Sequence, residues 1–266
     1  MWYDESIKSN YGGTAMKLGA QLFSLRSHLK TEEDLRRTFL RVKEIGYENV
    51  QLSGAAPMPA DFLKAVSEES SLPIVCTHSA FERIVNETDE LIREHLTFGC
   101  PVIGLGAMPK EYRNSREGLH TLTALLETPV KKILDAGLRF AYHNHAFELA
   151  PVDGTILFDE MLETLPDWQF ILDTYWVEFA GFRAVDYIRR VGSGRLTDIH
   201  YKDMANNEKR SICACGDGVL DFSEITAVCR EIGVRNALVE QDNAVDAPDP
   251  FDEMRRSFDH LRPIVH

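Results

Sequence analysis

The sequence is poor in cysteine and has no long apolar runs. Its five cysteines are scattered over 266 residues, too few for a disulfide framework. Cys213 and Cys215 are separated by one residue and have no second pair, which opposes a zinc site made of thiolates. No apolar run approaches the roughly 18–20 residues that cross a bilayer. The segment Met1–Glu5 has no basic region followed by an apolar stretch, so we expect no secretory signal and a cytoplasmic protein with reduced thiols.

Positive charge is also scarce. The chain has 29 Lys and Arg residues against 42 Asp and Glu residues, which gives a net charge of −13. Such a surface repels nucleic-acid phosphates and anionic lipid, so we expect neither nucleic acid nor membrane as a partner. A small-molecule substrate in a local pocket is compatible with this charge. A homodimer is left open, because no segment identifies an interface.

Linkers and glycine-rich phosphate loops are missing as well. We find no Pro/Ser-rich stretch and no low-complexity tract, which favours a single domain. The first apolar run is not followed by G-x-G-x-x-G, since residues 19–30 contain only Gly19. This absence opposes a dinucleotide-binding, doubly wound sheet.

What is present is a repeat of a short apolar run followed by an amphipathic segment. Continuous apolar runs of this length are typical of strands in a parallel sheet that helices cover. Eight such units predict a (β/α)8 TIM barrel, because closing the sheet removes the edges that an open eight-stranded sheet would expose. We expect strands at 18–23, 48–53, 73–78, 101–105, 138–143, 169–173, 196–201 and 236–241, and helices at 32–45, 60–69, 84–97, 117–136, 155–165, 221–232 and 249–262.

The boundaries of the predicted domain and of two helices have recognisable signals. Residues 1–16 are polar and contain glycine, so we expect a flexible extension ahead of a barrel domain over residues 17–266. Thr31 and Asp221 are each followed by acidic first-turn residues, which indicates helix N-caps. The Gly216–Gly218 turn is interpreted either as an active-site loop with anion-binding amides or as a connection that needs positive φ.

Polar side chains gather where the predicted strands end. In a TIM barrel the chemistry lies at the carboxyl ends of the strands. Asp173, His200 and Glu240 end three successive strands, and their alternation with apolar neighbours lets each face the barrel axis. Carboxylates with an imidazole at one mouth predict a site for a divalent ion, with Mn²⁺, Mg²⁺ and Co²⁺ preferred over thiolate-seeking metals.

Five segments resemble one protein family in order and spacing, over about residues 17–263. The chain resembles the sugar phosphate isomerase/epimerase family, whose members have a xylose isomerase-like TIM barrel. In that family a divalent metal is held by Glu, Asp, His and Glu from strands five to eight. The resemblance implies Asp173, His200 and Glu240 for the last three places and Mn²⁺ as the metal, with Mg²⁺, Co²⁺ or Zn²⁺ as alternatives. The matching segments are Tyr142–Glu148, Leu172–Trp176, His200–Asp203, Gly216–Phe222 and Val239–Asp242.

The first ligand place departs from the family pattern. His143 stands where many relatives have the glutamate, and Glu148 follows five residues later. We favour Glu148 as the fourth ligand, because a third anionic oxygen suits a hard cation. His143 is then a base or a substrate contact. The reverse assignment stays open.

The chemistry that the resemblance implies is proton abstraction next to a carbonyl. A metal on the substrate carbonyl and a neighbouring hydroxyl acidifies the adjacent C–H and stabilises an enediolate. We expect Glu240 and His143 to move protons, and Lys202 to neutralise developing negative charge. Such a protein is a metal-dependent sugar isomerase or epimerase. His78, His145 and Trp176 are expected to contact the substrate.

Two alternatives use the same pocket. A lyase or hydratase acting on keto-sugars or keto-inositols begins with the same enolisation, and the departure at His143 weakens an epimerisation that needs two symmetric glutamates. A sugar-binding barrel without catalysis would keep the pocket and show no metal-dependent turnover. The sequence has no recognisable Arg/Lys phosphate clamp, which favours an unphosphorylated sugar or keto-sugar.

Overall fold

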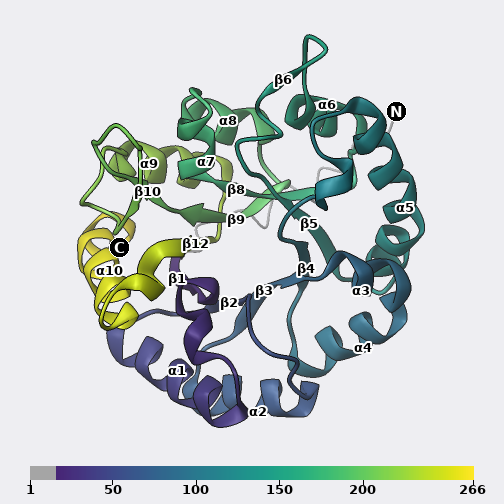
Figure 1. The fold of residues 1–266 in the computed structure, drawn as a ribbon. Coiled ribbons are helices and arrows are strands. Elements are labelled where there is room, and N and C mark those ends of the chain that lie inside the picture. The colour runs from purple at the N-terminus through teal and green to yellow at the C-terminus, as the bar shows by residue number, and fades with distance from the viewer. Residues whose placement is uncertain (1–15) are drawn as a thin grey trace.

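The computed structural model describes residues 16–266 and shows a closed barrel of eight parallel strands. The strand order around the barrel is β1-β12-β9-β8-β5-β4-β3-β2, which confirms the predicted single-domain TIM barrel. Figure 1 shows the strands at the centre, with the helices arranged around them. The barrel strands are β1 (Lys17–Gln21), β2 (Val50–Leu52), β3 (Ile74–Ser79), β4 (Val102–Leu105), β5 (Arg139–His143), β8 (Gln169–Asp173), β9 (Leu196–Tyr201) and β12 (Asn236–Val239).

All eight barrel strands lie where the apolar runs predict them. The expected extension falls largely on residues 1–15, which lie outside the described residues, whereas Met16 is buried. The first strand is shorter than expected, because the backbone turns into a 3-10 helix at Leu22. The apolar runs therefore predict the positions of the barrel strands. They do not predict where each strand ends, because the end depends on where the backbone turns into the following loop.

The helices follow the expected pattern with two differences. The segment predicted as one helix over 84–97 forms two, because Glu87 has non-helical dihedral angles between them. Two helices of six and eight residues between β8 and β9 were not predicted, since so few turns give a weak periodicity. The helices are α1 (Glu32–Ile45), α2 (Ala60–Ser70), α3 (Phe81–Asn86), α4 (Thr88–Phe98), α5 (Arg116–Asp135), α6 (Leu157–Thr164), α7 (Thr174–Phe179), α8 (Ala184–Val191), α9 (Phe222–Ile232) and α10 (Pro250–Val265).

Both predicted N-caps are formed. The Thr31 side chain accepts a hydrogen bond from the amide of Asp34, and Asp221 accepts from the amides of Ser223 and Glu224. Each cap satisfies backbone donors that have no partner within the helix. At the other end of α1, Gly46 has a φ of 121°, a conformation in which a side chain is strained.

Two apolar layers hold the barrel. The large core lies between the outward faces of the strands and the surrounding helices, while a small cluster of Cys76, Val102, Ala141 and Ile171 fills the barrel interior. Side chains alternate along a strand, so the residue two positions after an interior one faces the same axis. The interior cluster thus forms a floor, above which the next inward-facing residues of β3, β5 and β8 lie.

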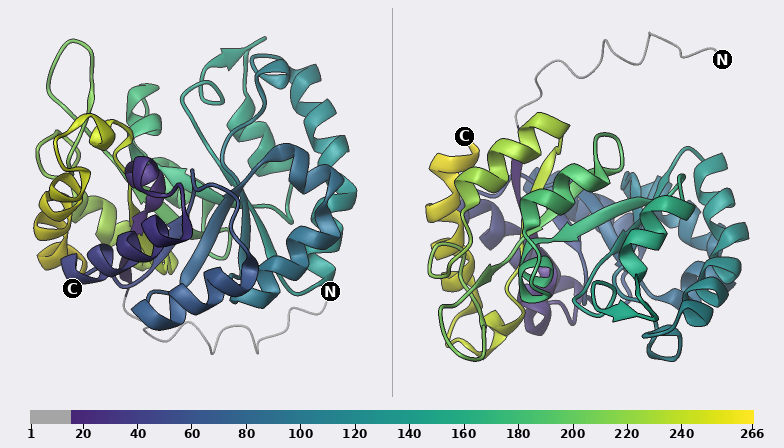
Figure 2. Two further views of the ribbon diagram at one scale, coloured as in Figure 1. Left: turned by 60° about the horizontal axis from the view of Figure 1, so that its bottom comes forward. Right: turned by 90° about the horizontal axis from the view of Figure 1, so that it is seen from above.

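Loops extend from the carboxyl ends of the strands. The loop after β5 carries the hairpin β6 (Pro151–Val152) and β7 (Thr155–Ile156), and the loop after β9 carries β10 (Asp203–Met204) and β11 (Ile212–Cys213). The side views show both loops projecting at the same end of the barrel (Figure 2). Across residues 16–266, no helix combines the length and apolar character needed to cross a membrane.

Candidate metal centre

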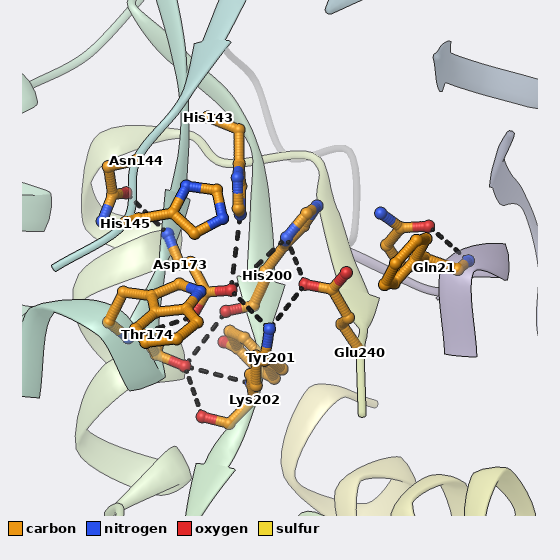
Figure 3. Close-up of polar contacts among 12 residues, drawn as sticks. Gln21, His143, Asn144, His145, Asp173, Thr174, His200, Tyr201, Lys202 and Glu240 are labelled. Carbon is orange, nitrogen blue, oxygen red and sulfur yellow. Dashed lines mark hydrogen bonds and ion pairs between the residues drawn. The ribbon is translucent and has the colours of Figure 1, made fainter. Parts of the chain in front are cut away.

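Four buried side chains converge at the carboxyl end of the barrel. One ligand atom from each of His143, Asp173, His200 and Glu240 lies within 4.8 Å of all the others. Two donors on opposite sides of one ion, each at about 2.1 Å, are about 4.2 Å apart, so these separations suit a single divalent cation. Figure 3 shows the four side chains directed toward one another.

The ends of four strands supply this group. His143 and Asp173 are the last residues of β5 and β8, His200 lies in β9, and Glu240 directly follows β12. The backbone hydrogen bond from the Glu240 amide to the Tyr201 carbonyl holds the end of β12 beside β9. Asp173 also caps α7, because its Oδ1 accepts from the amide of Trp176 while its Oδ2 faces the cluster.

His143 is oriented by the backbone of the neighbouring strand connection. Its Nδ1 lies 2.9 Å from the carbonyl oxygen of Gly106, which can only accept, so Nδ1 is the protonated nitrogen. The other nitrogen, Nε2, faces Asp173 Oδ2 at 3.4 Å. An imidazole that donates through one nitrogen to a carbonyl and turns the other toward carboxylates has the arrangement of a metal ligand.

His200 has the same arrangement with its nitrogens exchanged. Its Nε2 donates to Gln51 Oε1 at 2.6 Å, because the Oε1 atom of the Gln51 amide is an acceptor. Its Nδ1 is buried and lies 3.0 Å from Glu240 Oε2 without forming a hydrogen bond. A lone pair that faces two carboxylates requires a positive charge between them, from either a proton or a metal ion. The donor set therefore fits a divalent metal.

The pKa values of the cluster residues also indicate that the cluster attracts a cation. Burial lowers the pKa of His200, but Glu240 and Asp173 more than offset it and raise that pKa to about 9. Burial raises the pKa of Asp173 and of Glu240, but Lys202 and the two histidines bring both pKa values below the ordinary range. Both carboxylates are thus ionised.

Lys202 is part of the site and is only 1% exposed. Its Nζ lies 2.8 Å from Asp242, 3.2 Å from Glu240 and 3.5 Å from Asp173. Burial alone would lower the pKa of Lys202, but these three carboxylates raise it above the ordinary value. The ammonium group is therefore charged beside the cluster, as the expected role in neutralising negative charge requires.

The structure places Glu148 outside the cluster. Its carboxyl group accepts hydrogen bonds from the Tyr142 hydroxyl at 2.5 Å and from the His145 amide at 2.8 Å. Tyr142 alternates with His143 and belongs to the core between strands and helices, so Glu148 is held on the outer side of β5. The geometry therefore brings His143 rather than Glu148 to the other three ligands, as in the reverse assignment left open by the sequence.

The three expected substrate contacts surround the cluster. The ring centroid of His78 lies 5.1 Å from that of His143, and His145 lies 4.8 Å from His143 and 5.3 Å from Trp176. Burial lowers the pKa of His78 well below its usual value and that of His145 to about 3, so both rings are neutral. Each of the three side chains has a buried nitrogen without a hydrogen-bond partner among the described residues, namely His78 Nε2, His145 Nδ1 and Trp176 Nε1.

The Gly216–Gly218 turn binds the side-chain carboxylate of Asp203. The amides of Gly216 and Gly218 donate to one carboxylate oxygen of Asp203 at 2.9 and 3.0 Å. Gly216 has a φ of 99°, and a side chain at Gly218 would collide with Asp203. The turn is therefore a connection that needs its glycines, and it orders the loop after β9 around a buried aspartate.

The sequence analysis did not identify several residues that orient the side chains of the cluster. Gln51 bonds to His200, Gly106 bonds to His143, and Asp242 bonds to Lys202. A glutamine within the apolar run of β2 is a signal that could have identified Gln51. Nothing in the sequence indicates that a glycine carbonyl meets a histidine 37 residues away.

A hollow of about 680 Å³ lies at the opposite end of the barrel. Its lining includes Val130 and Lys131 of α5 and Trp168 in the turn before β8. These residues precede the amino ends of β5 and β8. Because the polar convergence lies at the carboxyl ends of the strands, this hollow is not the candidate site.

Comparisons with known proteins identify the fold. No protein-family model matches the chain, and no curated protein matches its sequence. A sugar phosphate isomerase/epimerase from Parabacteroides distasonis has a similar structure, with a TM-score of 0.78, 20% identity, and coverage of 96% of this chain and 97% of that one.

Two further solved structures are similar over nearly their whole length. D-allulose 3-epimerase from Methylomonas sp. gives a TM-score of 0.68 at 16% identity and covers 95% of this chain and 99% of its own. A xylose isomerase domain protein from Alicyclobacillus acidocaldarius gives 0.71 at 14% identity, with 94% and 98% covered. The resemblance inferred from sequence is thus confirmed at the level of structure: the chain has the fold of the sugar phosphate isomerase/epimerase and xylose isomerase-like TIM barrel proteins.

Proposed function

We propose that this protein is a divalent-metal-dependent isomerase or epimerase of sugars, acting by proton abstraction next to a carbonyl. The observation that carries the proposal is the convergence of His143, Asp173, His200 and Glu240 at the carboxyl end of a barrel of this fold. Mn²⁺ is the proposed metal. Two imidazoles among the ligands also suit Co²⁺ and Zn²⁺, and favour Mg²⁺ less.

The roles of the residues follow from their positions. The metal ion, when bound, polarises the substrate carbonyl and stabilises the negative charge that forms on its oxygen. Glu240 is ionised, and its Oε2 faces His200 and Lys202, so we assign its carboxylate as the base that removes the proton from the adjacent carbon. Lys202 holds a positive charge 3.2 Å from Glu240 and stabilises the negative charge around the reacting carbon. His143 is a ligand in this proposal.

A lyase acting on keto-sugars is the second candidate, and one observation favours it. Two-base epimerisation needs a carboxylate on each face of the substrate, but Glu148 is bound to Tyr142 and the His145 amide outside the cluster. Elimination needs one base and a proton donor for the leaving group. Glu240 supplies the base, and because the raised pKa of Lys202 makes its ammonium a poor proton donor, the leaving group takes its proton from solvent.

The surroundings support an unphosphorylated substrate. Three arginines after β1, β4 and β9 are already bound to backbone carbonyls: Arg26 to Phe23 and Asp242, Arg113 to Met108, and Arg210 to Glu178 and Phe179. Arg83, after β3, is paired with Glu87 and Glu94. The charged ammonium of Lys202 is already paired with three carboxylates. A phosphate would therefore have to compete with bonds that these cations already make.

Hydrogen–deuterium exchange tests the proposal. Protein stripped with EDTA and reloaded with Mn²⁺ is incubated in D₂O with a panel of ketoses, keto-sugars and keto-inositols, and the small molecules are read by NMR after the protein is removed. We expect metal-dependent deuterium incorporation next to the carbonyl. The products separate isomerase and epimerase from lyase.

Glu240→Gln is the decisive variant. It should lower the exchange rate at least about 100-fold, the usual contribution of a positioned base. Glu163→Gln, an exposed glutamate on α6, is the matched control and should exchange as the wild type does. Failure of the wild-type protein to bind Mn²⁺ would exclude the proposed centre, and exchange that survives Glu240→Gln would exclude Glu240 as the base.

A further inference from the structure

The imidazole of His78 is held in one tautomer by its neighbours. Its Nδ1 lies 3.4 Å from Gln21 Nε2 and 3.3 Å from Ser53 Oγ. The Gln21 amide has a fixed orientation, because its Oε1 accepts from the Phe23 amide at 2.9 Å (Figure 3). Its Nε2 is therefore the group that faces His78, and this group can only donate. Nδ1 of His78 must accept, which leaves the proton on Nε2.

This N–H group has no partner among the described residues, and its ring lies beside the candidate centre. His78 Nε2 is buried without a hydrogen bond among the described residues. The ring centroid lies 5.1 Å from His143 and 5.6 Å from His200, two of the four proposed ligands. A buried donor without an acceptor costs free energy and is rare in native proteins. An acceptor supplied by a bound molecule removes that cost.

The position of the ring is fixed from a third side. A Cβ at Gly106 would lie 2.8 Å from His78 Nδ1 and 2.9 Å from its Cγ, so only glycine leaves room for the imidazole. The same glycine accepts through its carbonyl from His143. His78 of β3 is thus held in a fixed orientation beside the cluster, whose residues come from the ends of β5, β8, β9 and β12.

We propose that His78 is a catalytic residue that donates its Nε2–H to the substrate oxygen on which negative charge develops, and that Gln21 and Ser53 position it. This inference rests on the proposed function. When Glu240 takes the proton, the C–H bond breaks, its electron pair forms the new C=C bond, and the carbonyl π pair moves to oxygen. The hydrogen bond from His78 stabilises that charge, and the proton stays on His78.

The tautomer can be measured without turnover. Protein with ¹⁵N-labelled histidine and bound Zn²⁺, which is diamagnetic, is studied by long-range ¹H–¹⁵N NMR, and the His78 signals are identified by their loss in His78→Phe. We expect a protonated Nε2 and a bare Nδ1. Gln21→Glu should move the proton to Nδ1, because a carboxylate accepts where the amide donates. A wild-type protein with the proton on Nδ1 would overturn the inference.

Binding of a planar enediolate mimic, glycolohydroxamate, provides the second measurement. Its affinity for the Zn²⁺-loaded protein, measured by calorimetry, should fall about tenfold or more in His78→Phe, which keeps the ring and removes the donor. Gln21→Glu should weaken binding similarly. Gln169→Glu, at the start of β8, is the matched control for the added charge and should bind as the wild type does.

The outcomes separate this inference from the proposed function. Zn²⁺ affinity should change by less than about twofold in His78→Phe, because His78 is not one of the four ligands. Equal hydroxamate affinity in all variants, or Zn²⁺ binding without any hydroxamate binding, would overturn the role of His78 and leave the metal centre standing. A wild-type protein that binds no Zn²⁺ would instead remove the proposed function itself.

Discussion

At the scale of single residues, the candidate centre is built by the direction of side chains more than by their charge. His143 and Glu148 lie within six residues of each other, yet one faces the barrel axis and the other faces Tyr142. The preference for Glu148 in the sequence rested on the affinity of hard cations for oxygen. Strand alternation, from which we expected Asp173, His200 and Glu240 to face the barrel axis, also places His143 inward, two residues after the interior Ala141.

Glu148 has its own consequence for stability. Burial raises the pKa of Glu148 to about 8, although the hydrogen bonds it accepts act in the opposite direction. The folded protein therefore binds a proton that the unfolded chain releases near pH 4.5. The contribution of Glu148 to the free energy of unfolding is fully present below about pH 4.5. It falls as the pH rises toward 8, by up to about 1.4 kcal/mol per pH unit.

Glu148→Gln should remove this dependence, because glutamine cannot ionise. We expect the free energy of urea unfolding to differ less between pH 5.5 and pH 8 in the variant than in the wild type. Glu163→Gln is the control and should keep the wild-type dependence. An unchanged pH dependence in Glu148→Gln would mean that Glu148 is already ionised over this range.

At the scale of elements, the connection after β4 orients two histidines from other strands. Gly106 gives its carbonyl to His143 and leaves space for His78. Gly106→Ala should therefore displace one of the two rings. We expect about a 10–100-fold loss of Mn²⁺ affinity, the usual effect of losing the partner that orients a ligand.

Gly99→Ala is the contrasting variant for calorimetric titration with Mn²⁺. Gly99 has a φ of 75° with open space around it, so alanine there strains the backbone without touching the site. It should lower stability and leave Mn²⁺ affinity unchanged. Equal Mn²⁺ affinity in Gly106→Ala and the wild type would show that a side chain at position 106 leaves His143 in place.

Elements differed in how far the sequence determined them. The eight strands were predictable, because each is a short apolar run that both barrel faces bury. The break between α3 and α4 and the short α7 were not, because one non-helical residue or six helical ones leave little periodicity. The convergence of Asp173, His200 and Glu240 could be predicted from strand ends. Gln51, Gly106 and Gln21 each contact a histidine of another strand, and such tertiary contacts leave no pattern in the sequence.

At the scale of the whole molecule, one half of the barrel provides the proposed ligands and the other half provides the side chains that orient histidines of the site. The ends of strands β5, β8, β9 and β12 provide the four proposed ligands, β3 provides His78, and β1 and β2 provide Gln21 and Gln51, which orient His78 and His200. Pairing of β1 with β12 closes the sheet and brings these groups together. The centre therefore depends on complete folding, because an open sheet would separate Gln21 and Gln51 from the ligands.

This dependence predicts that metal binding stabilises the whole barrel. A ligand that binds only the folded state adds about 2.7 kcal/mol at a concentration 100 times its dissociation constant. For a domain of this size that corresponds to a rise of about 5–10 °C in the midpoint of thermal unfolding. We expect this rise on adding Mn²⁺ to EDTA-stripped protein, measured by circular dichroism. Asp173→Asn should abolish it, because the amide loses the negative charge and keeps the oxygen that caps α7.

The exposed Asp167 provides the matched control, since Asp167→Asn changes the charge equally in the turn before β8 and should keep the full rise. A midpoint that Mn²⁺ does not move in the wild-type protein would contradict a folded-state metal site. A rise that persists in Asp173→Asn would place the binding elsewhere. A rise in the wild type and in Asp167→Asn alone would tie the stability of the barrel to the centre itself, because the four proposed ligands join four neighbouring strands of the sheet.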